Sequence, residues 1–355
     1  MDSKNFAAER VCGYDVAMAT RLEVRRLTVE LATPAGWVRP VNEVSFALGE
    51  GETLGIVGES GCGKTMLALA LMGLEPPGAR RTGEAWLTCR SGNGASPGAG
   101  TAPVRRENLL AASPAELRAL RGREIAMIFQ EPMTALNPVM RTGAQIEEAI
   151  RVHESALDKD EIHRLMLAAL ARAAVPAPVV RARQYPHQLS GGLRQRVMIA
   201  MALAAGPGVM IADEPTTALD VTVQKQILDL LAALRRELQL SLLFITHDLG
   251  VVAQIAGRVA VMYAGRIVEE GPALDVLRHP RHPYTEGLLR AAPRLEREKL
   301  ASIPGAVPSL NALPSGCAFA PRCPRRIAEC DARVPELLPV SDVPENRRAR
   351  CILVR

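Results

Sequence analysis

Residues 53–65, Thr53-Leu54-Gly55-Ile56-Val57-Gly58-Glu59-Ser60-Gly61-Cys62-Gly63-Lys64-Thr65, decide the fold of this chain. The first five are typical of a buried strand, and the apolar run that follows at residues 66–74 indicates a helix. The last eight match G-x-x-x-x-G-K-[ST], a phosphate-binding loop, in the strand–loop–helix context that this pattern requires. Glycines let backbone N–H groups converge on phosphate oxygens, and the helix N-terminus adds its positive end. We therefore expect the whole loop to bind a nucleotide, with Lys64 on the β/γ-phosphates and Thr65 on Mg²⁺: Gly58, Glu59, Ser60, Gly61, Cys62, Gly63, Lys64 and Thr65.

Two carboxylates, Asp213 and Glu214, follow a second apolar run at residues 209–212, which is predicted to be a buried strand. In phosphoryl transfer, the first carboxylate of such a pair holds Mg²⁺ directly or through water. The second is placed to polarise an attacking water. Taken alone, the pair is weak evidence for a site, and a solvated strand end would be the default interpretation. Together with the phosphate loop it predicts Asp213 as an Mg²⁺ ligand and Glu214 as a catalytic base.

Composition places the chain among globular proteins. It has 355 residues, of which 48% are hydrophobic and 23% are charged. The net charge of +5 is small and the basic residues alternate with acids, so we expect no nucleic-acid partner. The longest apolar runs fall far short of the ~18 residues of a membrane span. The first twenty residues show no secretory signal, so we expect a cytosolic protein with a loose leader at residues 1–20.

Further patterns predict an α/β fold with parallel strands joined by helical crossovers. Alternating residues at 22–31 and 41–48 indicate half-buried strands, and residues 242–246 indicate a third buried strand. Helical patterns cover residues 114–120, 143–174 and 228–238. Residues 91–103 are rich in Gly, Ser and Pro and predict a surface loop. Prolines and cysteines become dense after Gly271, where we place a domain boundary.

Four further motifs occur in one order along the chain: Gln130 in MIFQEP, Ser190-Gly191-Gly192 in LSGGLRQR, Asp220 in ALD, and His247 after the third strand. They resemble the Q-loop, signature, D-loop and switch histidine of ABC-type ATPases. Leu193 departs from the commonest signature residue, Gln, at a position that varies in that family. Each motif alone has a local alternative, such as a helix cap at Ser190 or His247. All four in this order are improbable by chance.

The resemblance implies an ABC-type nucleotide-binding domain at residues 21–271, with a RecA-like core, an antiparallel β subdomain and a helical subdomain at about 131–190. It implies that Gln130 joins Thr65 and Asp213 in holding Mg²⁺ and senses both the metal and the membrane subunit. It also implies that His247 orients the γ-phosphate. Ser190, Gly191 and Gly192 would act on ATP held by a partner cassette, so one subunit is an incomplete site. Trp37 lies where such proteins place an adenine-stacking aromatic, although a packing or cation–π role is as plausible.

Longer stretches at 130–138, 185–202, 214–223 and 282–285 resemble the ATPase subunits of bacterial oligopeptide and dipeptide importers. That resemblance implies hydrolysis of MgATP at the cytosolic face of the inner membrane. It implies as partners a second homologous ATPase subunit, two transmembrane permease subunits and, indirectly, an external solute-binding protein. Related branches import nickel, glutathione or other small solutes, and these substrates stay open. A soluble, non-transport ABC ATPase is the more distant alternative.

Four cysteines cluster in the expected C-terminal domain at residues 272–355: Cys317, Cys323, Cys330 and Cys351. Four thiolates suit an iron–sulfur cluster or tetrahedral zinc, although the C-x₂-C pairs of common zinc ribbons are missing. Some peptide-importer subunits carry a [4Fe–4S] cluster here, so the resemblance favours iron–sulfur over zinc. Four buried cysteines without metal are the remaining alternative.

Overall fold

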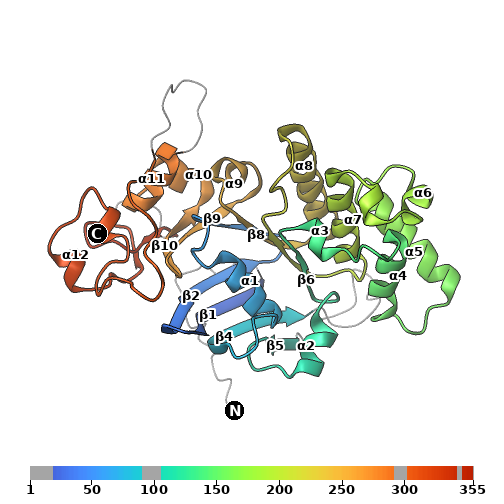
Figure 1. Cartoon of the computed structure of the whole chain (residues 1–355), viewed down its shortest axis with the longest axis horizontal. Helices are drawn as coiled ribbons and strands as arrows, with labels where there is room; N and C mark the ends of the chain where they lie inside the picture. Colours follow the sequence, from blue (N-terminus) through green and yellow to red (C-terminus); the bar gives the residue numbers. More distant parts are fainter. Residues whose placement is uncertain (1–18, 90–104, 292–301, 342–345, 355) are drawn as a thin grey trace, which may run out of the picture.

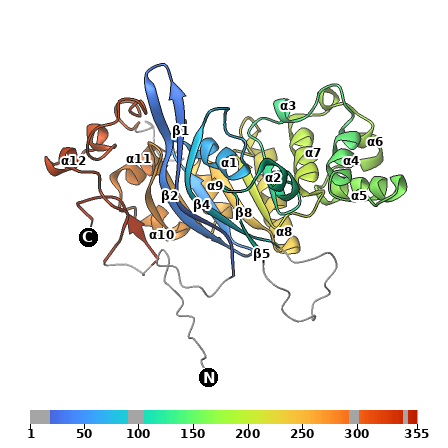
Figure 2. The ribbon, with the colours of Figure 1, turned by 90° about the horizontal axis from the view of Figure 1, so that it is seen from below.

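The computed structural model of the chain describes residues 19–89, 105–291, 302–341 and 346–354. Most of the leader expected at residues 1–20 and the loop expected at 91–103 lie outside these described residues. Two sheets occupy the middle of an elongated molecule (Figure 1). A group of helices lies at one end of the long axis (Figure 1). The described residues after Pro272, called the C-terminal segment from here on, lie toward the other end, as the second view also shows (Figure 2).

The smaller sheet is antiparallel, in the order β2-β1-β4-β5. Its first two strands are long and form a hairpin, and the alternation seen in the sequence buries one face of each. The buried apolar side chains of β1 are Leu22, Val24, Leu27 and Val29. The strands are β1 (Thr20–Thr33), β2 (Gly36–Gly49), β4 (Arg80–Cys89) and β5 (Arg105–Asn108).

The larger sheet has the order β11-β12-β10-β9-β3-β8-β7-β6. Its strands from β9 to β6 pair in parallel, which confirms the predicted crossover architecture. The parallel strands are almost entirely buried because helices and the smaller sheet cover their faces. The strands are β3 (Thr53–Val57), β6 (Ile125–Ile128), β7 (Val209–Asp213), β8 (Ser241–Thr246), β9 (Arg258–Tyr263), β10 (Arg266–Pro272), β11 (Leu338–Pro339) and β12 (Arg348–Ala349).

Helix α1 (Lys64–Met72) packs between the two sheets, against β1 and β2 on one side and β6 and β7 on the other. A second core forms around the helical group. That group comprises α3 (Pro132–Ala135), α4 (Thr142–Arg151), α5 (Lys159–Arg172), α6 (Pro178–Ala182), the 3₁₀ turn η1 (Pro186–Gln188), α7 (Gly191–Leu203) and α8 (Val221–Leu238). The remaining helices are α2 (Pro114–Leu120), α9 (Leu249–Ile255), α10 (Ala273–Arg278), α11 (Pro283–Ala291), η2 (Ala320–Arg322) and α12 (Glu329–Ala332). No helix in the described ranges is long and apolar enough to cross a bilayer.

The single helical pattern expected over residues 143–174 is divided into α4 and α5 in the structure. Helix α4 ends at Arg151, and a turn leads to Asp158. The Asp158 carboxylate accepts a hydrogen bond from the Glu161 N–H at 2.8 Å and caps the new helix. The apolar periodicity continues on both sides of this turn because both helices bury one face in the same core, so periodicity alone missed the break.

The C-terminal segment returns to the larger sheet, because β12 pairs with β10. A buried ion pair accompanies this return: Arg347 donates to the Glu269 carboxylate at 2.8 Å, and both side chains are at most 2% exposed. Glu269 also accepts hydrogen bonds from the backbone N–H groups of Arg281 and His282. The charge of Glu269 is thus compensated only when the end of the chain is in place.

We predict that Arg347→Met lowers the free energy of unfolding by about 3 kcal/mol or more, because it leaves the Glu269 carboxylate buried without its cation. Urea unfolding of the full chain measures this. Arg333→Met is the matched control, since Arg333 pairs with Glu329 at the surface, where such pairs contribute only about 0–1 kcal/mol. Equal stability of the two variants would contradict a structural role for the buried pair.

Candidate functional site

The loop from Gly58 to Thr65 connects the central strand β3 to α1, as the motif predicts. Gly63 lies in the left-handed region with φ of 107°, and a Cβ atom there would stand 1.9 Å from the Pro40 carbonyl oxygen. A Cβ atom at Gly58 would stand 2.2 Å from the Met262 carbonyl oxygen. Only glycine fits at either position, because the loop lies directly against the backbone of both sheets.

A cavity of about 230 Å³ opens at this loop. Lys64 is 4% exposed, and its ammonium group donates to the carbonyl oxygens of Gly58, at 2.7 Å, and Glu59, at 3.1 Å. The same ammonium nitrogen lies 3.9 Å from Oε1 of Glu214. The lining combines loop residues with side chains from two other strand ends: Pro40, Ser60, Gly61, Gly63, Lys64, Thr65, Met66, Gln130 and Glu214.

Asp213 ends strand β7 and is 1% exposed. Neither carboxylate oxygen accepts a hydrogen bond from a residue that the structure describes. Burial raises the pKa of Asp213, while the neighbouring Thr65 hydroxyl acts in the opposite direction. A buried carboxylate that lacks hydrogen bonds and faces a threonine hydroxyl fits the oxygen-rich, partly protein-derived shell that Mg²⁺ prefers.

Glu214 is the point at which the predicted catalytic residues meet. Its Oε2 atom lies 3.3 Å from the Gln130 amide nitrogen and 3.1 Å from Nδ1 of His247. The Thr217 hydroxyl donates to the same oxygen at 2.9 Å. The backbone of Glu214 is left-handed, with φ of 46°, and its N–H donates to the Ile245 carbonyl of the neighbouring strand. The structure therefore brings Gln130, Glu214 and His247 together from three strand ends.

The signature and the D-loop lie beside each other but outside the cavity lining. Ser190 caps α7 through a hydrogen bond from the Leu193 N–H, and Asp220 caps α8 through one from the Val223 N–H. The two helix starts are close: a Cβ atom at Gly192 would stand 2.7 Å from Val223, and one at Gly191 would stand 3.6 Å from Leu219. The helix-cap alternative for Ser190 is therefore realised, and its action on a partner's ATP stays a prediction.

Trp37 lies on β2 near the hairpin turn and is 45% exposed. The Arg80 guanidinium stands 3.9 Å from the centre of its ring. This is the cation–π arrangement considered as an alternative, and Trp37 is not among the residues that line the cavity. Contact with adenine stays a prediction.

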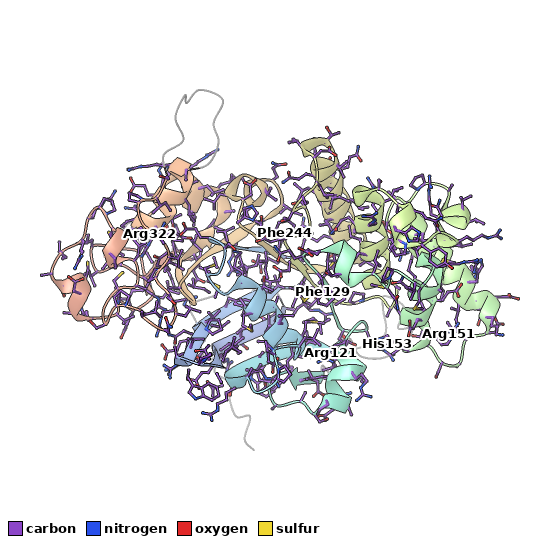
Figure 3. The ribbon with its side chains drawn as sticks, in the orientation of Figure 1. Arg121, Phe129, Arg151, His153, Phe244 and Arg322 are labelled. Carbon is purple, nitrogen blue, oxygen red and sulfur yellow. The ribbon has the colours of Figure 1, made fainter. Side chains whose placement is uncertain are left out.

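Three residues that contact the loop or Glu214 have no individual role predicted from the sequence. The Thr217 hydroxyl binds Glu214, three residues along the chain, where a capping side chain could have been suspected. Arg322 and Tyr284 contact Glu59 in the phosphate loop from the C-terminal segment, more than 220 residues away. The Arg322 side chain is labelled in Figure 3, beside the larger sheet. No local pattern connects residues so far apart.

The four C-terminal cysteines line one small apolar cavity, together with His282 and Phe319. All four are free thiols. Burial raises the pKa of Cys317, Cys323 and Cys351. Within the described ranges, no group of three or more His, Cys, Asp and Glu side chains has the arrangement that would hold a metal ion. The sequence clustering is thus a spatial clustering around a shared cavity.

Comparison with known proteins places this geometry in a family. Residues 41–217 match the ABC transporter family and residues 268–330 match the oligopeptide/dipeptide transporter C-terminal region. A provisionally named peptide import ATP-binding protein of Brucella ovis is 47% identical over 93% of this chain and 96% of its own length. The dipeptide transport ATP-binding protein DppD of Bacillus subtilis is 46% identical over 88% of this chain and 90% of its own length.

A solved structure supports the same assignment. The ATP-binding cassette MJ0796, described as a dimer in a post-hydrolysis state bound to ADP and Pi, has a TM-score of 0.59 and 26% identity. The match covers 71% of this chain and 98% of that one. Because the relatives match over nearly the whole chain, this protein belongs to the ABC transporter family of ATPases, in the group that carries the oligopeptide/dipeptide transporter C-terminal region.

Proposed function

We propose that this protein is the ATP-hydrolysing subunit that energises import of dipeptides or oligopeptides across a bacterial inner membrane. The observation that carries the ATPase is the convergence of Lys64, Gln130 and His247 on Glu214 beside the phosphate loop. Relatives named for peptide import and dipeptide transport support the substrate class.

In this proposal each side chain has its own role in binding or hydrolysing MgATP. The loop N–H groups and Lys64 bind the β- and γ-phosphates, where Lys64 exchanges its present carbonyl partners for phosphate oxygens. Thr65 and Asp213 hold Mg²⁺, which when bound neutralises charge on the phosphates. Glu214 orients the attacking water and accepts its proton at the carboxylate. Gln130 and His247 already contact that carboxylate, so they position it and line the path to the γ-phosphate.

The partners follow from the incomplete site. Ser190, Gly191 and Gly192 lie outside the cavity of their own chain, which supports a head-to-tail pair in which each signature faces the partner's ATP. The MJ0796 cassette has been solved as a dimer. We propose a second homologous ATPase subunit, two permease subunits that dock on the helical region between Gln130 and Ser190, and an external solute-binding protein. The chain would then sit peripherally on the cytosolic face of the membrane. We also propose that its domain boundaries lie at residues 20 and 271.

Glu214→Gln should reduce steady-state MgATP hydrolysis by the assembled transporter by at least about 100-fold, because the amide cannot accept the proton of the attacking water. ATP binding should persist, since Lys64 and the loop are untouched. Phosphate release and nucleotide binding measure the two effects. The control is Glu237→Gln on the exposed side of α8, which should leave hydrolysis unchanged. Retained hydrolysis in Glu214→Gln would remove Glu214 from the role of base.

We also propose that Cys317, Cys323, Cys330 and Cys351 hold a [4Fe–4S] cluster. The support is the donor set itself: four thiols of one segment line a single apolar cavity, and thiolates are the ligands that iron–sulfur clusters require. Among the described residues the thiols are not arranged to hold a metal ion, so binding would have to draw the four together. When bound, the cluster would tie the ends of a short, proline-rich segment together. Zinc is the competing occupant.

Anaerobic purification followed by iron, sulfide and zinc analysis distinguishes the two. A cluster predicts about four iron and four sulfide per chain and a broad visible absorbance that is lost in Cys323→Ser. Cys89→Ser, a buried cysteine on β4, is the control and should retain both. Stoichiometric zinc, or metal-free protein of normal stability, would contradict the cluster.

Uptake by cells tests the substrate. In a strain that lacks this chain and has no redundant system, entry of labelled dipeptide or longer peptide should fall to background. Wild-type protein should restore it and Glu214→Gln should not. Unchanged peptide uptake would reject the peptide substrate and leave nickel, glutathione or another small solute to be tested in the same strain.

A further inference from the structure

The phosphate loop is bound from outside by the C-terminal segment, at one residue. Glu59, the second residue of the loop, accepts two hydrogen bonds from the Arg322 guanidinium, at 2.7 Å and 3.0 Å. The backbone N–H of Glu59 donates to the Tyr284 hydroxyl at 2.8 Å. Its carbonyl oxygen accepts from the Lys64 ammonium group at 3.1 Å. Glu59 therefore links the C-terminal segment to the lysine that binds phosphate.

Arg322 is held firmly in place for this contact. It is the last residue of η2, and its side chain is 4% exposed. Its Nε donates to the Pro304 carbonyl at 3.0 Å, and its guanidinium lies 5.9 Å from the centre of the Tyr263 ring. The hydrogen bonds with Glu59 raise the pKa of Arg322. The guanidinium is thus oriented before any nucleotide arrives, and a planar fork on a carboxylate gives a strong, directional pair.

Tyr284 is fully buried in an aromatic cluster with Tyr263 and Phe319. Its ring centre lies 4.5 Å from that of Tyr263 and 5.4 Å from that of Phe319. Burial raises the pKa of Tyr284 far above its usual range, so the hydroxyl stays neutral and can accept the loop N–H. The cluster holds the Tyr284 hydroxyl beside the loop. The hydroxyl in turn holds the backbone N–H of Glu59 in place.

The negative charge of Glu59 makes its contact with Arg322 important for nucleotide binding. A phosphate loop binds a polyanion, and an uncompensated carboxylate within the loop would repel it. The Glu59 carboxylate is 28% exposed, so solvent screens it only in part. Arg322 cancels its charge, and Arg322 comes from the C-terminal segment rather than from the nucleotide-binding domain. The affinity of the loop for phosphate then depends on a segment that the phosphate-loop motif does not include.

We propose that Arg322 and Tyr284 are positioning residues for nucleotide binding: Arg322 neutralises Glu59 and Tyr284 holds the Glu59 backbone, so that the C-terminal segment completes the phosphate loop. This proposal rests on the proposed ATPase function. Arg322 lies directly before Cys323 and five residues after Cys317, so the four-cysteine cavity and the phosphate loop are held by the same short stretch.

MgATP titration of the purified full chain tests the proposal through a cycle of four proteins: wild type, Arg322→Met, Glu59→Gln and the double variant. Arg322→Met should weaken MgATP binding on the order of tenfold, since it leaves one uncompensated charge near the phosphates. Glu59→Gln should bind MgATP more tightly than wild type, because it leaves the Arg322 cation uncompensated near the phosphates. The double variant, which removes both charges, should bind within about threefold of wild type. The loss in Arg322→Met should be larger for ATP than for ADP and should shrink at high salt.

Two further variants separate charge from structure. Tyr284→Phe removes only the acceptor of the loop N–H, so it should weaken binding even in the Glu59→Gln background and without salt dependence. Arg325→Met is the matched control, because Arg325 is exposed and pairs with Glu286 on the outer side of the same segment. It should bind MgATP as wild type does. Arg322→Lys, which keeps the charge, should retain most of the affinity. Arg322→Gln, which also removes the charge, replaces Arg322→Met if that variant does not fold.

Unchanged MgATP affinity in Arg322→Met, or a loss that Glu59→Gln fails to restore, would overturn the role of Arg322. Unchanged affinity in Tyr284→Phe would overturn the role of Tyr284. An Arg322→Lys variant that loses as much affinity as Arg322→Met would overturn charge compensation. Wild-type protein that does not bind MgATP would contradict the proposed function itself, which is a different result.

Discussion

One carboxylate, Glu214, has to face the phosphate loop at the edge where four parallel strands end. The strands β3, β8, β7 and β6 are adjacent in the sheet. Strand β3 leads through the phosphate loop to its polar group, and the other three strands deliver theirs just after their ends. In that order the groups are Lys64, His247, Glu214 and Gln130. Because parallel strands present their carboxyl ends at one edge, the buried apolar runs that pack the sheet also bring these side chains within hydrogen-bonding reach. Catalytic geometry here is a consequence of sheet packing.

The same sheet explains why the C-terminal segment belongs to the working protein. Strand β12 pairs with β10 at the sheet edge, and an aromatic core joins α11 and η2 to β9. Glu269 and Arg347 make that attachment depend on a buried charge pair. Through Glu59 the segment then reaches the phosphate loop. The C-terminal segment supplies Arg322 as a salt-bridge partner and the Tyr284 hydroxyl as a hydrogen-bond acceptor to the loop. In the proposal above, the segment is therefore part of the nucleotide site.

Local patterns in the sequence were enough to predict the phosphate loop, the strand before it and the helix after it, and the parallel arrangement of β3, β7 and β8. The loop motif requires glycine at positions such as Gly63, where the backbone of another strand lies too close for any side chain. This part of the motif therefore reflects a tertiary contact. Periodicity failed at residues 152–158, because a capped turn interrupts two helices that share one core. Arg322 and Tyr284 could not be predicted, since their partner Glu59 is distant in sequence and their own surroundings resemble ordinary core. The grouping of four cysteines was visible in the sequence, but their common cavity required the fold.

The central claim is that Glu214 and the phosphate loop form half of a site which a second cassette completes. The most direct measurement is an experimental structure of the assembled transporter, carrying Glu214→Gln in this chain and determined in the presence of MgATP. The account predicts ATP between two cassettes, with its phosphates on Lys64 and its Mg²⁺ beside Thr65 and Asp213 of this chain, and with the signature of the other cassette on the γ-phosphate. It also predicts Ser190 of this chain on the second nucleotide. ATP bound by one cassette alone, with Ser190 far from any phosphate while the nucleotide sites are full, would contradict it.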